Sequence, residues 1–137
     1  MRTAAIALAL TAAAMTGGCG GITAPDLFLV TRSGAGPHAH LTLLVNEEGV
    51  VHCNGRSAGR LADAQIVKAR QITEELEKPA SQHLALSAAP NSVLHYELRD
   101  ANGTVSFADN SPHQPPVLRQ LVLFVLQSAQ HVCGLPE

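Results

Sequence analysis

Apolar and polar residues alternate with a period of two in several short stretches of the chain, which is typical of β-strands with one buried face. In residues 38–45 the apolar residues Ala39, Leu41, Leu43 and Val45 fall at every second position, with Leu44 on the other face. This spacing predicts one strand face toward a core and one toward solvent. The same alternation, or a compact apolar run between turn residues, predicts further strands at 26–31, 50–53, 93–99 and 104–108.

Two longer stretches repeat apolar residues every three or four positions, which predicts amphipathic helices. The first covers residues 61–77, with charged residues on its polar side, and is expected to end before Pro79. The second covers residues 117–132 and is apolar almost all round over two turns. We therefore expect the second helix to be the most buried element of the domain.

Residues that favour turns separate these elements. Glycine and proline mark turns at 33–37 and 46–49, while 54–59 and 81–92 are expected to be irregular. The dipeptide at 102–103 is Asn-Gly, which suits a type I′ hairpin.

The element order is thus βββαββα, which predicts an α+β fold. We expect a two-layer sandwich, with an antiparallel sheet of about five strands and two helices on one face. Residues 26–137 would form one domain. The covered face is expected to carry Leu41, Leu43, Val51, Tyr96, Leu98 and Phe107.

Residues 1–19 have the parts of an export signal. Arg2 is followed by an uncharged, mostly apolar run at 3–15 and then by Thr16-Gly17-Gly18-Cys19. Small residues before a cysteine resemble the lipobox of bacterial lipoproteins. Thr16 departs from the large aliphatic residue usual at that place, so an ordinary secretory signal is the alternative. The apolar run is shorter than the ~20 residues that a bilayer span needs.

The lipobox resemblance implies a signal peptide at 1–18, lipid on Cys19 and a short tether at 19–25. The domain would then lie on the extracytoplasmic face of the cell membrane. A chain rich in Ala, Leu and Gly is also similar to lipoproteins of high-GC actinobacteria.

Charge and aromatic content argue against nucleic acid as a partner. The net charge is −2, and the chain has one Tyr and no Trp for base stacking. If Cys19 carries lipid, Cys53 and Cys133 remain as a pair in an oxidising compartment, which predicts a disulfide. Such a bond would close a loop of roughly 80 residues. Free thiols or metal ligands are the alternatives, although the chain has no CxxC motif.

Histidines offer a candidate metal site. His38 and His40 are predicted on one strand face, about 6–7 Å apart, and His52 on the neighbouring strand could add a third ligand. The alternative is that they are polar residues on a solvent-exposed sheet face, which His95 would share. The motifs of nucleophilic, zinc-dependent or nucleotide-dependent enzymes are missing from the sequence, so we expect a non-catalytic protein without a cofactor.

Two loops are candidate binding surfaces, because recognition usually resides in loops held by a rigid sheet. The first contains Arg32, Ser33, Gly34 and Gly36, with little side-chain bulk. The second is stiffened by prolines and contains Ser111, His113 and Gln114. The alternative is that both loops are only connectors.

Four segments of the domain, in order, resemble the emfourin family of small proteins. They are residues 30–34 (VTRSG), 96–98 (YEL), 103–109 (GTVSFAD) and 115–126 (PPVLRQLVLFVL). This chain departs from the family at residues 34–36 and in its lipobox and cysteine pair. Emfourin-like proteins inhibit thermolysin-like metalloproteases. The resemblance implies a binding module for a protein such as an exported protease, with metal binding as the alternative function.

Overall fold

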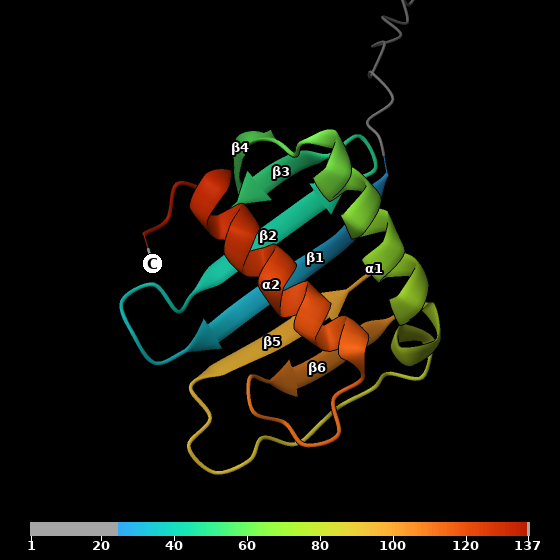
Figure 1. Ribbon diagram of the computed structural model, residues 1–137, viewed down its shortest axis with the longest axis vertical. Helices are drawn as coiled ribbons and strands as arrows, with labels where there is room; N and C mark the ends of the chain where they lie inside the picture. Colours follow the sequence, from blue (N-terminus) through green and yellow to red (C-terminus); the bar gives the residue numbers. More distant parts are fainter. Residues whose placement is uncertain (1–24, 137) are drawn as a thin grey trace, which may run out of the picture.

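The computed structural model describes residues 25–136. In this part of the chain six strands form one antiparallel sheet, in the order β4-β3-β2-β1-β5-β6, and both helices cover the same face of it (Figure 1). The predicted α+β class and layer arrangement are confirmed, with one strand more than expected. The elements are β1 (Asp26–Gly34), β2 (Leu41–Asn46), β3 (Val50–Cys53), β4 (Arg56–Arg60), α1 (Asp63–Ser81), β5 (Leu94–Arg99), β6 (Thr104–Ala108) and α2 (Pro116–His131).

The connection between β1 and β2 differs from the prediction. β1 is longer and β2 begins only at Leu41, so His38 and His40 lie in a loop rather than on a strand. The guanidinium group of Arg32 donates hydrogen bonds to the carbonyl oxygens of His38 (2.7 Å) and Ala39 (3.1 Å). Because these carbonyls are bound to a side chain, they do not extend the ladder of β2.

β4 is the strand that the sequence analysis misses. It follows Asn54 and Gly55, whose φ angles are both positive, 52° and 78°. Cys53 pairs with Arg56 across this two-residue loop. Positive φ at both central positions is the geometry of a type I′ hairpin, for which Asn-Gly is the favoured dipeptide.

The β5–β6 hairpin is present, but its turn is not the predicted type. Asn102 does not take the positive φ that a type I′ turn requires. Instead, a carboxylate oxygen of Asp100 accepts hydrogen bonds from the N–H groups of Asn102 (2.7 Å) and Gly103 (2.9 Å). A side chain thus replaces the backbone partner, as in an Asx turn.

α1 continues through Pro79 to Ser81, although it was expected to end before the proline. Pro79 lies in the last turn, where it removes one hydrogen-bond donor and few residues follow. Ala80 is fully buried, and its carbonyl oxygen approaches Gly103 so closely that a Cβ there would lie 2.2 Å away. Packing against the β5–β6 turn therefore supports this last turn.

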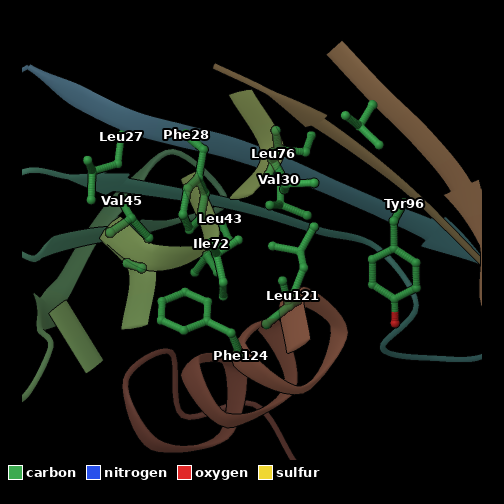
Figure 2. Packing of buried hydrophobic residues seen from close by; sticks show 14 of the residues in the cluster. Leu27, Phe28, Val30, Leu43, Val45, Ile72, Leu76, Tyr96, Leu121 and Phe124 are labelled. Carbon is green, nitrogen blue, oxygen red and sulfur yellow. The ribbon is translucent and has the colours of Figure 1, made fainter. Parts of the chain in front are cut away.

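The core lies between the sheet and the two helices (Figure 2). Phe28 of β1 meets Phe124 of α2 edge to face, with ring centroids 5.8 Å apart and planes at 80°. The six residues predicted for the covered sheet face are all buried. Tyr96 is one of them, and its side chain projects from the sheet on the side of α2 (Figure 2).

α2 is less completely buried than its composition suggests. Leu123 and Leu126 are exposed by 54% and 43%. The helix packs against the sheet on one side and has α1 as a neighbour on another, so part of its surface stays uncovered. Within residues 25–136, no helix combines the length and hydrophobicity needed to cross a membrane.

The predicted disulfide is present. Cys53 at the end of β3 is bonded to Cys133, just after α2, with Cα atoms 5.8 Å apart and a sequence separation of 80. The bond joins the sheet layer to the helix layer.

The two edges of the sheet differ. Beside β6, Ser106 accepts a hydrogen bond from the N–H of Leu86 and donates one to the carbonyl of Leu84, both at 2.9 Å. That edge is therefore covered by part of the segment expected to be irregular. β4, at the other edge, is exposed along its whole length and has an arginine at each end. It pairs with β3 through a bulge that leaves Ala58 without a partner residue.

Candidate binding groove

Three connections gather at one end of the sheet: the loop after β1, the segment before β5 and the loop after β6. In Figure 1 this is the end to which the arrowheads of β1 and β6 point. The N–H of Ala35 donates to the carbonyl of Val93 at 3.1 Å, and the N–H of Asp109 donates to the carbonyl of Leu94 at 2.9 Å. The two predicted binding loops are therefore linked through the segment before β5.

Some residues of the first predicted binding loop hold the loop in shape, and others are exposed on its surface. Arg32 is only 8% exposed and holds the loop from inside through the carbonyl bonds described above. Ser33 and Gly34 belong to β1 and are half-buried. Gly36 is exposed, and a Cβ placed on it would have no neighbour within 4 Å. The accessible part of this loop is thus its tip.

The second predicted binding loop shows the same division. Ser111 is buried, and its hydroxyl oxygen accepts a hydrogen bond from the N–H of Ala108 at 2.8 Å. The side-chain amide of Gln114 donates to the carbonyl of Ala108 at 2.9 Å. His113 is exposed and has a positive φ of 58°. Ser111 and Gln114 therefore hold the loop in shape, and His113 is the predicted binding residue that solvent reaches.

A groove of about 260 Å³ lies between the tip of the first loop and the C-terminal end of α2. Val93 and Leu126 line it and remain 50% and 43% exposed. Neither residue was predicted as a site residue from the sequence. For Leu126 the sequence did contain an indication, because the apolar stripe of α2 is wider than a single helix face can bury. Further apolar lining residues are Pro37, Ala39, Leu94 and Leu135.

Arg32 adds a positive charge to this mainly apolar lining. Its hydrogen-bond acceptors on the loop are neutral carbonyl oxygens. Within residues 25–136 the one ion pair joins Arg99 to Glu97, so no carboxylate of this part of the chain lies within ion-pair distance of Arg32. Burial and, to a smaller extent, the charge of Asp109 raise the pKa of the Tyr96 phenol, and the charge of Arg32 and its hydrogen bond to the phenol offset only part of that rise.

Asp109 fastens the loop after β6 to the segment before β5. Its carboxylate accepts hydrogen bonds from the Ser92 hydroxyl at 3.0 Å and from the Val93 N–H at 3.3 Å. Burial raises the pKa of the Asp109 carboxyl, but these bonds outweigh it together with backbone hydrogen bonds from Leu94 and Asn110. The pKa of Asp109 therefore lies below its ordinary value.

The predicted metal ligands are not brought together. His38 and His40 are exposed residues of the loop before β2, whereas His52 lies within β3 opposite Leu44. The expected placement of His38 and His40 on one strand face is wrong, because neither residue is in a strand. In the part of the chain that the structure describes, no three His, Cys, Asp or Glu side chains form a group that could hold a metal ion.

The chain enters the domain at the end of the sheet away from the groove. Pro25 precedes β1, and its carbonyl accepts a hydrogen bond from the N–H of Glu47, in the β2–β3 turn, at 2.9 Å. The predicted signal peptide and lipidation site, residues 1–18 and Cys19, lie outside the described residues. Comparison of the chain with models of protein families, with curated proteins and with solved structures finds no significant match.

Proposed function

We propose that this protein is a lipid-anchored, non-catalytic binding module that holds a protein partner at the extracytoplasmic face of the cell membrane. The observation that carries the proposal is that the chain enters the domain at the end of the sheet opposite the groove. Pro25 enters the domain at one end of the sheet, where the proposed tether would join it, and the groove with its surrounding loops lies at the other end. β1 has nine residues, so the two ends are about 30 Å apart. A module anchored this way presents its groove away from the bilayer.

The groove also has the character of a protein-binding surface. Val93 and Leu126 both line the groove, and half or nearly half of the surface of each side chain is exposed to solvent. Exposed apolar side chains that line a concave surface are typical of interaction sites. The exported proteases are the partner class we favour, because residues 30–34, 96–98, 103–109 and 115–126 resemble the emfourin family.

Photo-crosslinking in living cells tests the binding role. A photoreactive amino acid is placed singly at Val93 or His38, beside the groove, and at Glu48 or Val67 as exposed controls elsewhere on the domain. We expect the groove positions to yield the same discrete crosslinked protein and the control positions to yield none. Equal crosslinking from all four positions, or none from any, would contradict the proposal.

A separate assay tests the class of partner. The purified protein is mixed with a thermolysin-like metallopeptidase secreted by the same organism, and cleavage of a peptide substrate is followed. We expect slower cleavage, with less effect from a Leu126→Glu variant, because the new carboxylate would lie in the apolar groove. If cleavage is unchanged while crosslinking succeeds, the partner belongs to another class.

A further inference from the structure

We propose that the groove captures the free C-terminus of a partner polypeptide that ends in an aliphatic residue. In this arrangement Arg32 binds the α-carboxylate and the apolar lining receives the terminal side chain. The inference rests on the proposed binding function and specifies which part of the partner enters the groove. Three features of the described residues support it: the charge of Arg32, the apolar lining and the size of the groove.

The charge of Arg32 favours an anionic ligand. Its guanidinium group has five N–H donors, of which Nε binds Ala39, one donor of Nη2 binds His38 and another interacts with the Tyr96 phenol. These acceptors and the Tyr96 phenol are neutral. A charge that is largely withdrawn from water without an ion-pair partner is unfavourable, and a bound anion relieves this. The planar guanidinium matches the geometry of a carboxylate, which is the anion that every free C-terminus carries.

The lining favours an aliphatic group next to that carboxylate. Val93 and Leu126 are the most exposed large apolar residues along the groove, and Leu94 and Leu135 lie beside them. An incoming aliphatic side chain would remove these surfaces from water, which is the main favourable term in association. A purely polar ligand would bind Arg32 but leave the rest of the groove uncovered.

The size of the groove selects among ligands that carry both groups. Its volume of about 260 Å³ lies just below the range of volumes of pockets that hold whole small molecules, roughly 300–1,000 Å³. One or two residues fit this space, whereas a long fatty acid would extend beyond it. An internal Asp or Glu brings a carboxylate without an adjacent aliphatic group. A C-terminal Leu, Ile or Val has both on one Cα atom.

The test compares two peptides that differ only at the terminus. The purified, 15N-labelled protein is titrated with the N-acetylated hexapeptide Gly-Ser-Gly-Ser-Ala-Leu as the free acid, and with the same peptide as its C-terminal amide. We expect the acid to shift the amide signals of Ala39, Val93 and Leu94. We also expect it to bind at least about tenfold more tightly than the amide, the factor typical of one charged hydrogen bond.

Two variants locate the effect. Leu126→Glu changes an exposed position, so it should fold normally, and it is expected to abolish binding of the free acid. Arg32→Gln is expected to bind acid and amide equally. Because Arg32 also holds its loop, the fold of that variant is checked first. The comparison of acid with amide on the unaltered protein decides the question even if the variant does not fold.

The inference is overturned if acid and amide bind equally or if neither binds at millimolar concentration. Saturable binding of decanoate without peptide binding would equally overturn it in favour of a lipid ligand. Dimerisation of the protein that is lost in Leu126→Glu, again without peptide binding, would instead assign the groove to a second copy. If crosslinking from Val93 persists in any of these cases, the proposed binding function stands and only the C-terminal ligand is rejected.

Discussion

Asp109 joins two segments that are distant in sequence, and it does so as an anion. Its carboxylate accepts hydrogen bonds from Ser92 and Val93, and its pKa lies below the ordinary value because these and two further backbone bonds outweigh the effect of burial. A group whose pKa is lower in the folded state stabilises the fold at pH values above its unfolded pKa. This contribution is lost as the pH falls through the folded-state pKa.

We therefore expect Asp109→Asn to lower the free energy of unfolding at neutral pH and to have progressively less effect as the solution is acidified. Asparagine keeps the shape of the side chain but cannot ionise, so the comparison isolates the charge. Urea denaturation at a series of pH values measures it, with Glu48→Gln as a control for the loss of one surface charge. A difference that stays constant from neutral to acidic pH would contradict this role.

Two glycines of the groove loop provide a matched pair. Gly34 and Gly36 both have positive φ angles, 147° and 117°. A Cβ on Gly34 would lie 2.1 Å from the carbonyl oxygen of Val93, whereas one on Gly36 would meet nothing within 4 Å. Gly36→Ala should cost about 1–2 kcal/mol from backbone strain alone. Gly34→Ala should lower the free energy of unfolding more, because the backbone around the Val93 carbonyl must also move. Equal losses in chemical denaturation would show that the contact is unimportant.

The roles of single residues were the hardest part to predict from sequence. Glycine and proline correctly located the two candidate loops. Arg32, Ser111 and Gln114 were predicted as binding residues, and the prediction did not include the hydrogen bonds by which they hold backbone groups around their own loops. Whether a polar side chain turns inward depends on which carbonyl and N–H groups lack a ladder partner. That is decided by tertiary packing and not by local sequence.

At the scale of elements, two Asn-Gly dipeptides have different outcomes. At residues 54–55 the dipeptide forms a type I′ turn and creates β4, so the turn rule applied to 102–103 would have found this strand. At 102–103 the preceding Asp100 supplies a side-chain acceptor that competes with the backbone turn. The periodicity of apolar residues predicted most strands, both helices and the buried sheet face. The Asn-Gly dipeptide alone could not predict that the Asp100 side chain would compete with the backbone turn.

This competition leads to a prediction for the β5–β6 hairpin. Asp100→Ala removes the acceptor of two backbone N–H groups and should lower the free energy of unfolding by about 1–3 kcal/mol. Asp100→Asn keeps one oxygen and is expected to cost clearly less. Thermal and urea denaturation of both variants check this. A similar loss for the two variants would mean that the charge, and not the acceptor geometry, holds the turn.

At the scale of the whole molecule, the Cys53–Cys133 disulfide connects the two layers. It closes a loop of 80 residues, so it restricts the unfolded chain strongly. The double variant Cys53→Ser, Cys133→Ser should lose about 2–5 kcal/mol of unfolding free energy. The unaltered protein in the presence of a reductant should show the same loss. A change below about 1 kcal/mol in either case would show that packing alone holds the layers together.

The proposed anchor is tested independently of the domain. We expect mass spectrometry of the protein from membranes to find an N-terminus at Cys19 that carries lipid. We also expect Cys19→Ala to release the protein into the soluble fraction, because the lipid is the proposed attachment. An unmodified terminus elsewhere, or unchanged membrane association of the variant, would reject lipid anchoring and leave the binding groove to be tested separately.

The unequal edges of the sheet have a consequence for crowding. Proteins confined to a membrane plane meet one another far more often than proteins free in solution, and always in related orientations. An uncovered strand edge would then favour edge-to-edge pairing of sheets from different copies. In the described sheet, residues 84–86 shield the edge at β6, while β4 combines a bulge with arginines at both ends. Two copies approaching through β4 would bring like charges together on mismatched backbones, which would disfavour pairing between neighbouring copies of a protein anchored as proposed.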